Sequence, residues 1–475
     1  MEIIHFAAEC YPVAKVGGLA DVVGALPKYQ CQAGHYAKVV MPAYDTRFMH
    51  QNSWQNDYQG YIYLGNLELP YTILRESTNK LGYDLYCVYI QGLTDRKNIY
   101  SEHDDTERFF AFQLAALDWI NQWQHLPDIL HCHDHHTALI PFLKQYAWKF
   151  QKLRNIKTVF TIHNGLYQGW FSWNKLHYFP AFDTWKSGLL DWAGTINPMS
   201  SAVRCADAIT TVSPSYMREL QYSSYGLEIL FQQLSYKCYG ILNGIDYEVW
   251  NPATDTYLDK HYTIDNVNEV KAQHKQEICE TFRLNPDNPL IAFIGRLVHE
   301  KGADLLPQAM GQAMYETQGR ICFIALGSGS SQIEYELERL KIYCPGIFNC
   351  YIGYHEALSH KIYAAADFLL MPSRVEPCGL NQMYALRYGT IPIVRRVGGL
   401  QDTVQDIGEW EGFGICFQQP NVLDIIHATH RATYLYYYNF DFLKSLRQRI
   451  MTFDNSWQNS QRKYEQVYRK ILQEE

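Results

Sequence analysis

Residues 368–389 carry the pattern that most restricts the fold of this chain. An apolar run ends at Pro372 and predicts a buried strand. A loop with one carboxylate, Glu376, follows it, and a helical pattern then runs from about Leu380 to Gly389, a residue type that commonly ends helices. Strand, loop and helix in this order predict a parallel α/β sheet, in which such loops lie at the carboxyl edge where ligands bind.

The chemistry of this loop suits a phosphorylated sugar. The backbone N–H groups of Cys378, Gly379 and Leu380 open the predicted helix, and a helix start favours an anion. Glu376 cannot hold a phosphate, but its carboxylate is a good acceptor for hydroxyl groups, such as those of a sugar or ribose. An ordinary turn with a solvated glutamate is the alternative.

A second unit of the same kind opens the chain. Residues 3–8 predict a buried strand, and Lys15, Gly17, Gly18 and Asp21 stand just ahead of or within the first turn of a helical pattern. Glycine lets the backbone approach a ligand closely, and lysine can meet negative charge there. A glycine turn with a solvated lysine is the alternative.

Two further predicted strands bring polar residues to the same sheet edge. Residues 129–133 lead to Asp134, and residues 158–162 lead to His163. Histidines cluster around Asp134, but this aspartate follows His133 directly, whereas dinuclear hydrolases of the metallo-β-lactamase kind use His-x-His-x-Asp-His. We therefore expect no metal here and keep Asp134 as the candidate, although a lone histidine such as His163 is more often structural.

A second sheet begins with the apolar residues 290–294. Arg296 and Lys301 flank the turn that follows, and a planar guanidinium fork with a lysine point charge can neutralise a diphosphate. The glycine turn at 327–329 lacks the third glycine of a dinucleotide fingerprint because Gln332 occupies that position, so NAD binding is poorly supported. No Asp-x-Asp pair occurs, so fixed cations should replace the divalent metal of many sugar-nucleotide enzymes.

The alternation of strands and helices predicts an α/β protein with two doubly wound, Rossmann-like domains that face each other across a deep cleft. We place the first domain at residues 1–245, with antiparallel hairpins inserted at about 55–92, and the second at 246–455. We expect residues 456–475 to form a helix with one apolar face. A length of 475 residues agrees with two domains because it exceeds the usual single core.

Composition narrows the choice of partners and compartment. A formal net charge of −8 argues against general binding of nucleic acid or anionic membranes. No apolar run approaches the roughly 20 residues that span a bilayer. The twelve cysteines include no CxxC pair, and no signal segment follows Met1, so reduced thiols in the cytoplasm fit best.

Several segments together resemble the bacterial glycogen synthase family, from Ile3 to the helix at Trp457. The segments are Lys15-Val-Gly-Gly-Leu, Thr161-Ile-His-Asn, Ile241-Leu-Asn-Gly-Ile-Asp with Val249-Trp-Asn-Pro, Gly295-Arg296 with Lys301-Gly302, and Glu376-Pro-Cys-Gly-Leu. These are family 5 glycosyltransferases of GT-B fold, similar to plant starch synthases. The resemblance implies retaining, metal-independent transfer of glucose from ADP-glucose to the non-reducing 4-hydroxyl end of an α-1,4-glucan such as glycogen, with no other cofactor.

The resemblance also implies roles for single residues. Lys15, Arg296 and Lys301 would contact the donor phosphates, and Tyr354 would lie near the adenine. The helix at 456–475 would cross back onto the N-terminal domain. The catalytic candidates are Glu376, Arg296, Lys301, His163 and Asp134. The candidates for donor binding are Lys15, Gly17, Gly18, Asp21, Asn243, Tyr354, Cys378, Gly379 and Leu380.

Departures from the family pattern leave alternatives open. Asn381 stands where the family usually has threonine, and we expect its side-chain oxygen to cap the helix. Gly165 and Leu166 interrupt the spacing that follows His-Asn, which could alter acceptor preference. The nearest rivals are a transferase that uses UDP-glucose or a small acceptor, and an inactive glycan-binding homologue. A phosphorylase would need a pyridoxal-bearing lysine that no motif identifies.

Overall fold

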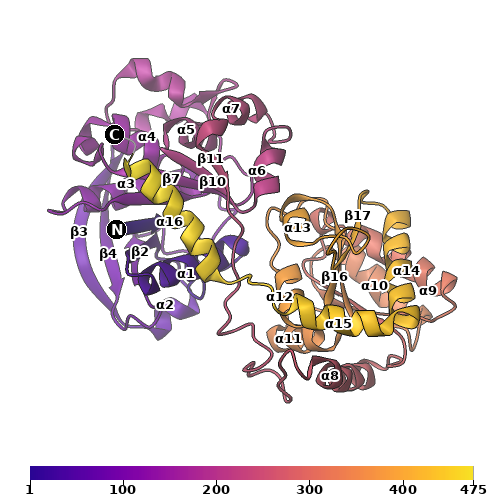
Figure 1. The fold of residues 1–475 in the computed structure, drawn as a ribbon. Coiled ribbons are helices and arrows are strands. Elements are labelled where there is room, and N and C mark those ends of the chain that lie inside the picture. Colours follow the sequence, from indigo (N-terminus) through magenta and orange to yellow (C-terminus); the bar gives the residue numbers. More distant parts are fainter. Residues whose placement is uncertain (474–475) are drawn as a thin grey trace. The chain divides into compact units, whose positions relative to one another are not determined.

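The computed structural model describes residues 1–473. In this part of the chain the backbone forms two compact units (Figure 1). Unit 1 comprises Met1–Leu242 together with the segment from Trp457, and unit 2 comprises Asn243–Ser456. Each unit is built around its own largely parallel sheet with helices on its faces, which confirms the predicted class of two Rossmann-like α/β domains.

Unit 1 holds the first eleven strands of the described chain and most of its short helices. Its strands are β1 (Glu2–Phe6), β2 (Tyr36–Pro42), β3 (Trp54–Leu64), β4 (Leu67–Glu76), β5 (Asp84–Tyr89), β6 (Ile129–His133), β7 (Lys157–Ile162), β8 (Asp191–Trp192), β9 (Thr195–Ile196), β10 (Ala208–Thr211) and β11 (Cys238–Gly240). Its helices are α1 (Gly18–Gln32), α2 (Arg47–Gln51), α3 (Asp105–Asn121), α4 (Ile140–Tyr146), α5 (Pro198–Cys205), α6 (Pro214–Leu220), α7 (Glu228–Gln233) and α16 (Trp457–Gln473).

The main sheet of unit 1 runs in the order β11-β10-β7-β6-β1-β2-β5-β4-β3. Every neighbouring pair is parallel except those of β4, which is antiparallel to both β5 and β3. Antiparallel pairing of β3 with β4 and of β4 with β5 agrees with the hairpins expected at about 55–92, and β5 also pairs in parallel with β2, which joins all three strands to the main sheet. Period-two alternation is common to both kinds of pairing, so the pattern could not distinguish them.

Helix α16 returns to unit 1 and packs on α1 (Figure 1, yellow and indigo). Trp457, Tyr464 and Val467 of α16 share one buried cluster with Val22 and Leu26 of α1. Burial of each such side chain stabilises by about 1.5–3 kcal/mol. The apolar face of the C-terminal helix is thus part of the core of unit 1.

Unit 2 is a six-stranded parallel sheet within the described residues, in the order β14-β13-β12-β15-β16-β17. Its strands are β12 (Leu290–Ile294), β13 (Cys322–Gly327), β14 (Phe348–Ile352), β15 (Phe368–Met371), β16 (Ile391–Arg395) and β17 (Ile415–Phe417). Its helices are α8 (Val267–Phe282), α9 (Leu306–Glu316), α10 (Ser331–Tyr343), α11 (Glu356–Ala365), α12 (Asn381–Arg387), α13 (Gly398–Thr403), α14 (Val422–Tyr438) and α15 (Phe440–Ile450).

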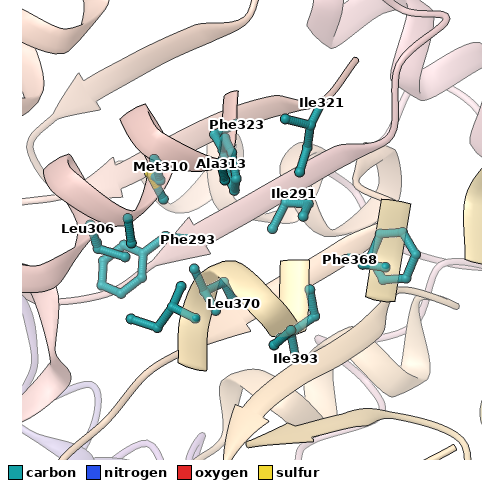
Figure 2. Packing of buried hydrophobic residues seen from close by; sticks show 14 of the residues in the cluster. Ile291, Phe293, Leu306, Met310, Ala313, Ile321, Phe323, Phe368, Leu370 and Ile393 are labelled. Atoms are coloured by element: carbon teal, nitrogen blue, oxygen red, sulfur yellow. The ribbon is translucent and has the colours of Figure 1, made fainter. Parts of the chain in front are cut away.

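The core of unit 2 lies between this sheet and its helices. Figure 2 shows Phe293 of β12 beside Leu306 of α9, with Leu370 of β15 close by and Ile291 further along β12, nearer to Ala313 of α9. These side chains are almost fully buried. Alternate residues of a strand point to one face, which is why Ile291 and Phe293 share one buried cluster. The packing holds the ends of β12 and β15 in place.

Both sheets have a topological switch point beside their first strand. In unit 1, β1 lies between β2 and β6, and in unit 2, β12 lies between β13 and β15. In open α/β sheets, ligands bind in the crevice outside the carboxyl ends of the strands at such a point. The loops that follow β1, β6, β12 and β15 are therefore the places to look for a site.

Candidate functional site

The loop between β15 and α12 is fixed by backbone contacts that only glycine permits. Gly302 has a φ of +68°, and a Cβ atom there would lie 2.2 Å from the carbonyl oxygen of Pro372. A Cβ atom on Gly398 would lie 2.1 Å from the carbonyl oxygen of Glu376. The N–H of Gly399 donates to that same carbonyl at 3.0 Å. The loop around Glu376 is therefore held between two neighbouring turns.

A pocket of about 190 Å³ opens at the switch point of unit 2, and Lys301 and Glu376 both line it. The Lys301 Nζ donates to the two carboxylate oxygens of Glu376 at 2.7 and 2.6 Å. The Ser373 hydroxyl donates to the same carboxylate at 2.9 Å. The Glu376 side chain is 8% exposed and that of Lys301 is 25% exposed, so this ion pair is largely shielded from water.

The backbone that follows Glu376 also reaches this pocket. Gly379 and Leu380 line its wall, whereas Cys378 is buried. Burial raises the pKa of the Cys378 thiol to about 12, against a hydrogen bond from the backbone of Asn243, so the thiol is neutral. Asn243 is itself buried, and within residues 1–473 its Oδ1 has no hydrogen-bond partner.

The expectation that Asn381 caps helix α12 is wrong. Leu380 occupies the cap position, and Asn381 is the first helical residue. The Asn381 Nδ2 instead donates to the carbonyl oxygen of Ile294 at 2.7 Å. The side chain therefore ties the start of α12 to the end of β12, a contact between segments far apart in the sequence.

Arg296 and Tyr354 do not share the contacts of Lys301. The Arg296 side chain is 63% exposed and reaches Glu300 at 3.3 Å. Tyr354 is 80% exposed and its hydroxyl contacts Glu356. The structure thus brings Lys301 and Glu376 together in one pocket, while Arg296 and Tyr354 lie at the surface of unit 2.

In unit 1, the glycine loop after β1 is organised by Glu9, a residue that the sequence reasoning missed. The buried Glu9 carboxylate accepts the backbone N–H of Val16 at 2.5 Å and that of Gly17 at 2.8 Å. The Tyr100 hydroxyl donates to its other oxygen at 2.5 Å. An acidic residue in the apolar stretch just after the first strand was the available signal. The amide of Gly17 consequently faces Glu9.

The two glycines of this loop are not needed by the fold itself. Gly17 has an extended backbone with φ of −138°, and a Cβ atom on Gly17 or Gly18 would meet no heavy atom within 4 Å. The space beside them is open, as a binding loop requires. Lys15, which follows the same strand, pairs with Asp21 of α1 at 2.6 Å.

Asp134 and His163 meet at the ends of β6 and β7. The Asp134 Oδ1 accepts the backbone N–H of His163 at 2.7 Å, and Asp134 holds a left-handed φ of +56°. Burial raises the pKa of Asp134 to about 7, against backbone N–H groups that lower it. Burial also lowers the pKa of His163 to about 3. A strained backbone and two perturbed side chains at a strand edge are typical of functional sites.

Three buried histidines beside this edge are close enough to share a metal ion. The ligand atoms of His5, His131 and His133 lie within 4.8 Å of one another. All six of their ring nitrogens already take part in hydrogen bonds with other side chains. These rings therefore take part in a hydrogen-bond network in the structure. The absence of a metal stays a prediction.

Comparisons with known proteins agree with this architecture. Residues 2–233 match the family model described as starch synthase catalytic domain, and residues 274–432 match that of glycosyl transferases group 1. A glycogen synthase from Flavobacterium johnsoniae is 53% identical over 474 residues, which cover 100% of each chain. The catalytic domain of starch synthase IV from Arabidopsis thaliana, solved with ADP and acarbose bound, matches with a TM-score of 0.88 and 32% identity over 99% of each chain.

A more distant match shows the fold alone. Sucrose-phosphate synthase from Thermosynechococcus elongatus has a TM-score of 0.62 at 16% identity, covering 99% of this chain and 98% of that one. Two parallel sheets, each with candidate residues at its switch point, together with these likenesses, define a glycosyltransferase of GT-B fold. Identity over the full length is specific enough to go further: the chain belongs to the glycogen synthase family. Among the described residues no helix is long and apolar enough to cross a membrane.

Proposed function

We propose that this enzyme transfers glucose from ADP-glucose to the non-reducing 4-hydroxyl end of an α-1,4-glucan such as glycogen. The observation that carries the proposal is the Lys301–Glu376 pair in the pocket of unit 2. The related starch synthase IV was solved with ADP and acarbose bound, and this supports ADP-glucose as donor and a glucan as acceptor.

In this proposal Lys301 binds the diphosphate of the donor and Glu376 binds its sugar. The Lys301 ammonium group has three N–H donors and gives two hydrogen bonds to the Glu376 carboxylate, so the third donor can reach a phosphate oxygen. The carboxylate can accept sugar hydroxyl groups, and its bond from Ser373 holds it in place. Arg296, which the structure shows as exposed, would add a second cation by rotating its long side chain toward the diphosphate.

The reaction that we propose is a displacement on one face of the sugar. The bond between the anomeric carbon and the ADP oxygen breaks while a bond to the acceptor 4-oxygen forms, and the acceptor proton passes to the departing phosphate. The configuration at the anomeric carbon is retained. Lys301 and Arg296 stabilise the charge that develops on the diphosphate, where preorganised cations contribute most. We assign Lys15 to the same phosphates, and Asp134, His163 and Asn243 to the glucose and acceptor.

Lys301, with Arg296 as the second cation, also supports transfer without a divalent metal. Asp134 and Glu376 are the carboxylates available for a double displacement, but both are engaged: Asp134 by backbone N–H groups and Glu376 by Lys301.

We further propose a cytoplasmic location. None of the twelve cysteines, all of which lie in the described part of the chain, forms a disulfide.

Incubation with labelled ADP-glucose or UDP-glucose, with and without glycogen, tests the proposal. We expect labelled polymer and free ADP only with ADP-glucose and glycogen, unchanged by EDTA, with new linkages cleaved by α-amylase. Lys301→Met is the variant that should lose transfer, and Lys361→Met, which removes an exposed ion pair with Asp259 outside the pocket, is the matched control.

Each rival function gives a different result in the same assay. Polymer labelled from UDP-glucose but not from ADP-glucose would identify UDP-glucose as the donor. Glucan binding without nucleotide release would indicate an inactive glycan-binding protein. Visible absorbance of a pyridoxal group would indicate a phosphorylase. Polymer labelling from neither donor would remove the synthase proposal.

A further inference from the structure

A row of histidines connects His163 to the interior of unit 1. The Nε2 of His163 lies 3.0 Å from Nδ1 of His133, and the Nε2 of His133 lies 3.0 Å from Nδ1 of His5. The Nε2 of His5 then lies 2.8 Å from Oε1 of Gln30 on helix α1. We call His163, His133 and His5 the histidine row. Every contact in it joins one ring nitrogen to one polar atom.

All three rings of the row are neutral. Burial lowers the pKa of His5 to about 4 and that of His163 to about 3, and it holds the pKa of His133 well below its usual range. A neutral imidazole has one N–H and one lone pair, on different nitrogens. Each hydrogen bond in the row therefore has a direction, and the direction of one bond sets the next.

The Gln30 carbonyl oxygen sets that direction because it can only accept. His5 must then donate from Nε2, which leaves its Nδ1 to accept from Nε2 of His133. Nδ1 of His133 in turn accepts from Nε2 of His163. The last group in the row is Nδ1 of His163, which keeps its lone pair and receives no hydrogen bond from residues 1–473.

The C-terminal helix holds Gln30 in this orientation. The Gln30 Nε2 donates to the hydroxyl of Tyr468 on α16 at 3.1 Å. That hydroxyl lies 2.7 Å from Nδ1 of His131, and the Nε2 of His131 lies 2.6 Å from the hydroxyl of Thr161. Tyr468 can therefore accept from Gln30 and donate to His131, so both sides of the Gln30 amide are satisfied. The hydrogen bonds from His5 and from Tyr468 thus meet at the Gln30 amide, which lies 438 positions before Tyr468 in the sequence.

We propose that Gln30 and Tyr468 are positioning residues that hold His163 as its Nε2-protonated tautomer, so that Nδ1 accepts a hydrogen bond from a hydroxyl of the sugar substrate. The tautomer follows from the contacts within unit 1, and only the identity of the hydroxyl rests on the proposed function. An Nδ1 that carried a proton would instead favour a phosphate or carbonyl oxygen. The row thus gives His163 a preference for hydroxyl groups over anions.

Nitrogen-15 NMR of the full chain with labelled histidine measures the tautomers directly. Long-range proton–nitrogen correlations separate protonated from unprotonated ring nitrogens, and a His163→Asn variant assigns the signals of His163. We expect an excess of at least about tenfold of the Nε2-protonated form of His163, which corresponds to about 1.4 kcal/mol. The same pattern should hold for His133 and His5.

Gln30→Met removes the acceptor and should reduce that excess to less than about threefold. Gln461→Met is the matched control, because it also removes a buried side-chain amide, but one on α16 that pairs with Glu465, outside the row. If Gln30→Met fails to fold, Tyr468→Phe replaces it, and its excess should also fall because the Gln30 amide loses its partner.

Two results would overturn the proposal. The first is an Nδ1-protonated His163 in the unaltered protein, which would mean that the Gln30 amide is reversed and every donor in the row points the other way. The second is a tautomer ratio that neither Gln30→Met nor Tyr468→Phe changes. Neither result depends on glucose transfer, so the failure of this proposal and the failure of the proposed function are separate outcomes.

Discussion

Removal of Lys301 separates the contribution of its ion pair to stability from its contribution to transfer. Lys301→Met removes the ion-pair partner of Glu376, whose side chain is 8% exposed in the structure, and leaves Ser373 as its remaining side-chain donor. Loss of one member of a buried ion pair costs about 3–5 kcal/mol. Because Lys301 is 25% exposed and the Ser373 bond remains, we expect the free energy of unfolding to fall by about 2–3 kcal/mol.

The double variant Lys301→Met/Glu376→Gln should recover part of this loss. It leaves no unpaired charge, so we expect it to be more stable than Lys301→Met alone by about 1–2 kcal/mol, a coupling that a double-mutant cycle measures. Transfer should not recover in parallel. Both groups are assigned to the donor, and loss of one such group costs about 100-fold or more in turnover.

Urea unfolding and ADP release with glycogen measure the two quantities on the same samples. The reasoning would be refuted if Lys301→Met changed the free energy of unfolding by less than about 0.5 kcal/mol, since a loss that small is typical of an exposed ion pair. It would also fail if the double variant regained turnover along with stability, because the pair would then act only through the fold.

Four further substitutions give predictions for single residues. Gly302→Ala should lower stability by about 1–3 kcal/mol in thermal unfolding because of its left-handed backbone and the close Pro372 oxygen, whereas Gly17→Ala should leave stability within about 0.5 kcal/mol and raise the KM for the donor. Arg296→Ala should change stability by under about 0.5 kcal/mol and reduce turnover about 100-fold, so unaltered turnover would remove Arg296 from the site. The folded pKa of Asp134, about 7, lies above its ordinary value of 3.8, so its contribution to stability is lost as pH rises through this window. In urea unfolding, the free energy of unfolding of Asp134→Asn relative to the unaltered protein should therefore rise by up to about 1.4 kcal/mol per pH unit up to about pH 7 and stay level above it. A difference that does not change with pH would contradict this.

Local pattern was sufficient for the fold class. Strand, loop and helix around Glu376 and again around Lys15 predicted parallel sheets, because apolar periodicity and helix-ending glycines are properties of neighbouring residues. The same reasoning placed Lys301 and Glu376 at sheet edges, and the structure joins them in one pocket. It did not reveal that β5 also pairs in parallel with β2 and so joins the hairpins to the main sheet, since strand pairing depends on segments elsewhere in the chain.

The sequence by itself determined which residue types stand at the strand ends of this protein, and so the class of chemistry that they can perform. Only the tertiary structure decided which of them meet: Glu9 with the amides of the glycine loop, Asn381 with the end of β12, and Gln30 with a tyrosine near the C-terminus. The physical reason is that periodicity and capping act over a few residues, whereas the direction of a buried hydrogen bond depends on every partner that packing brings to it.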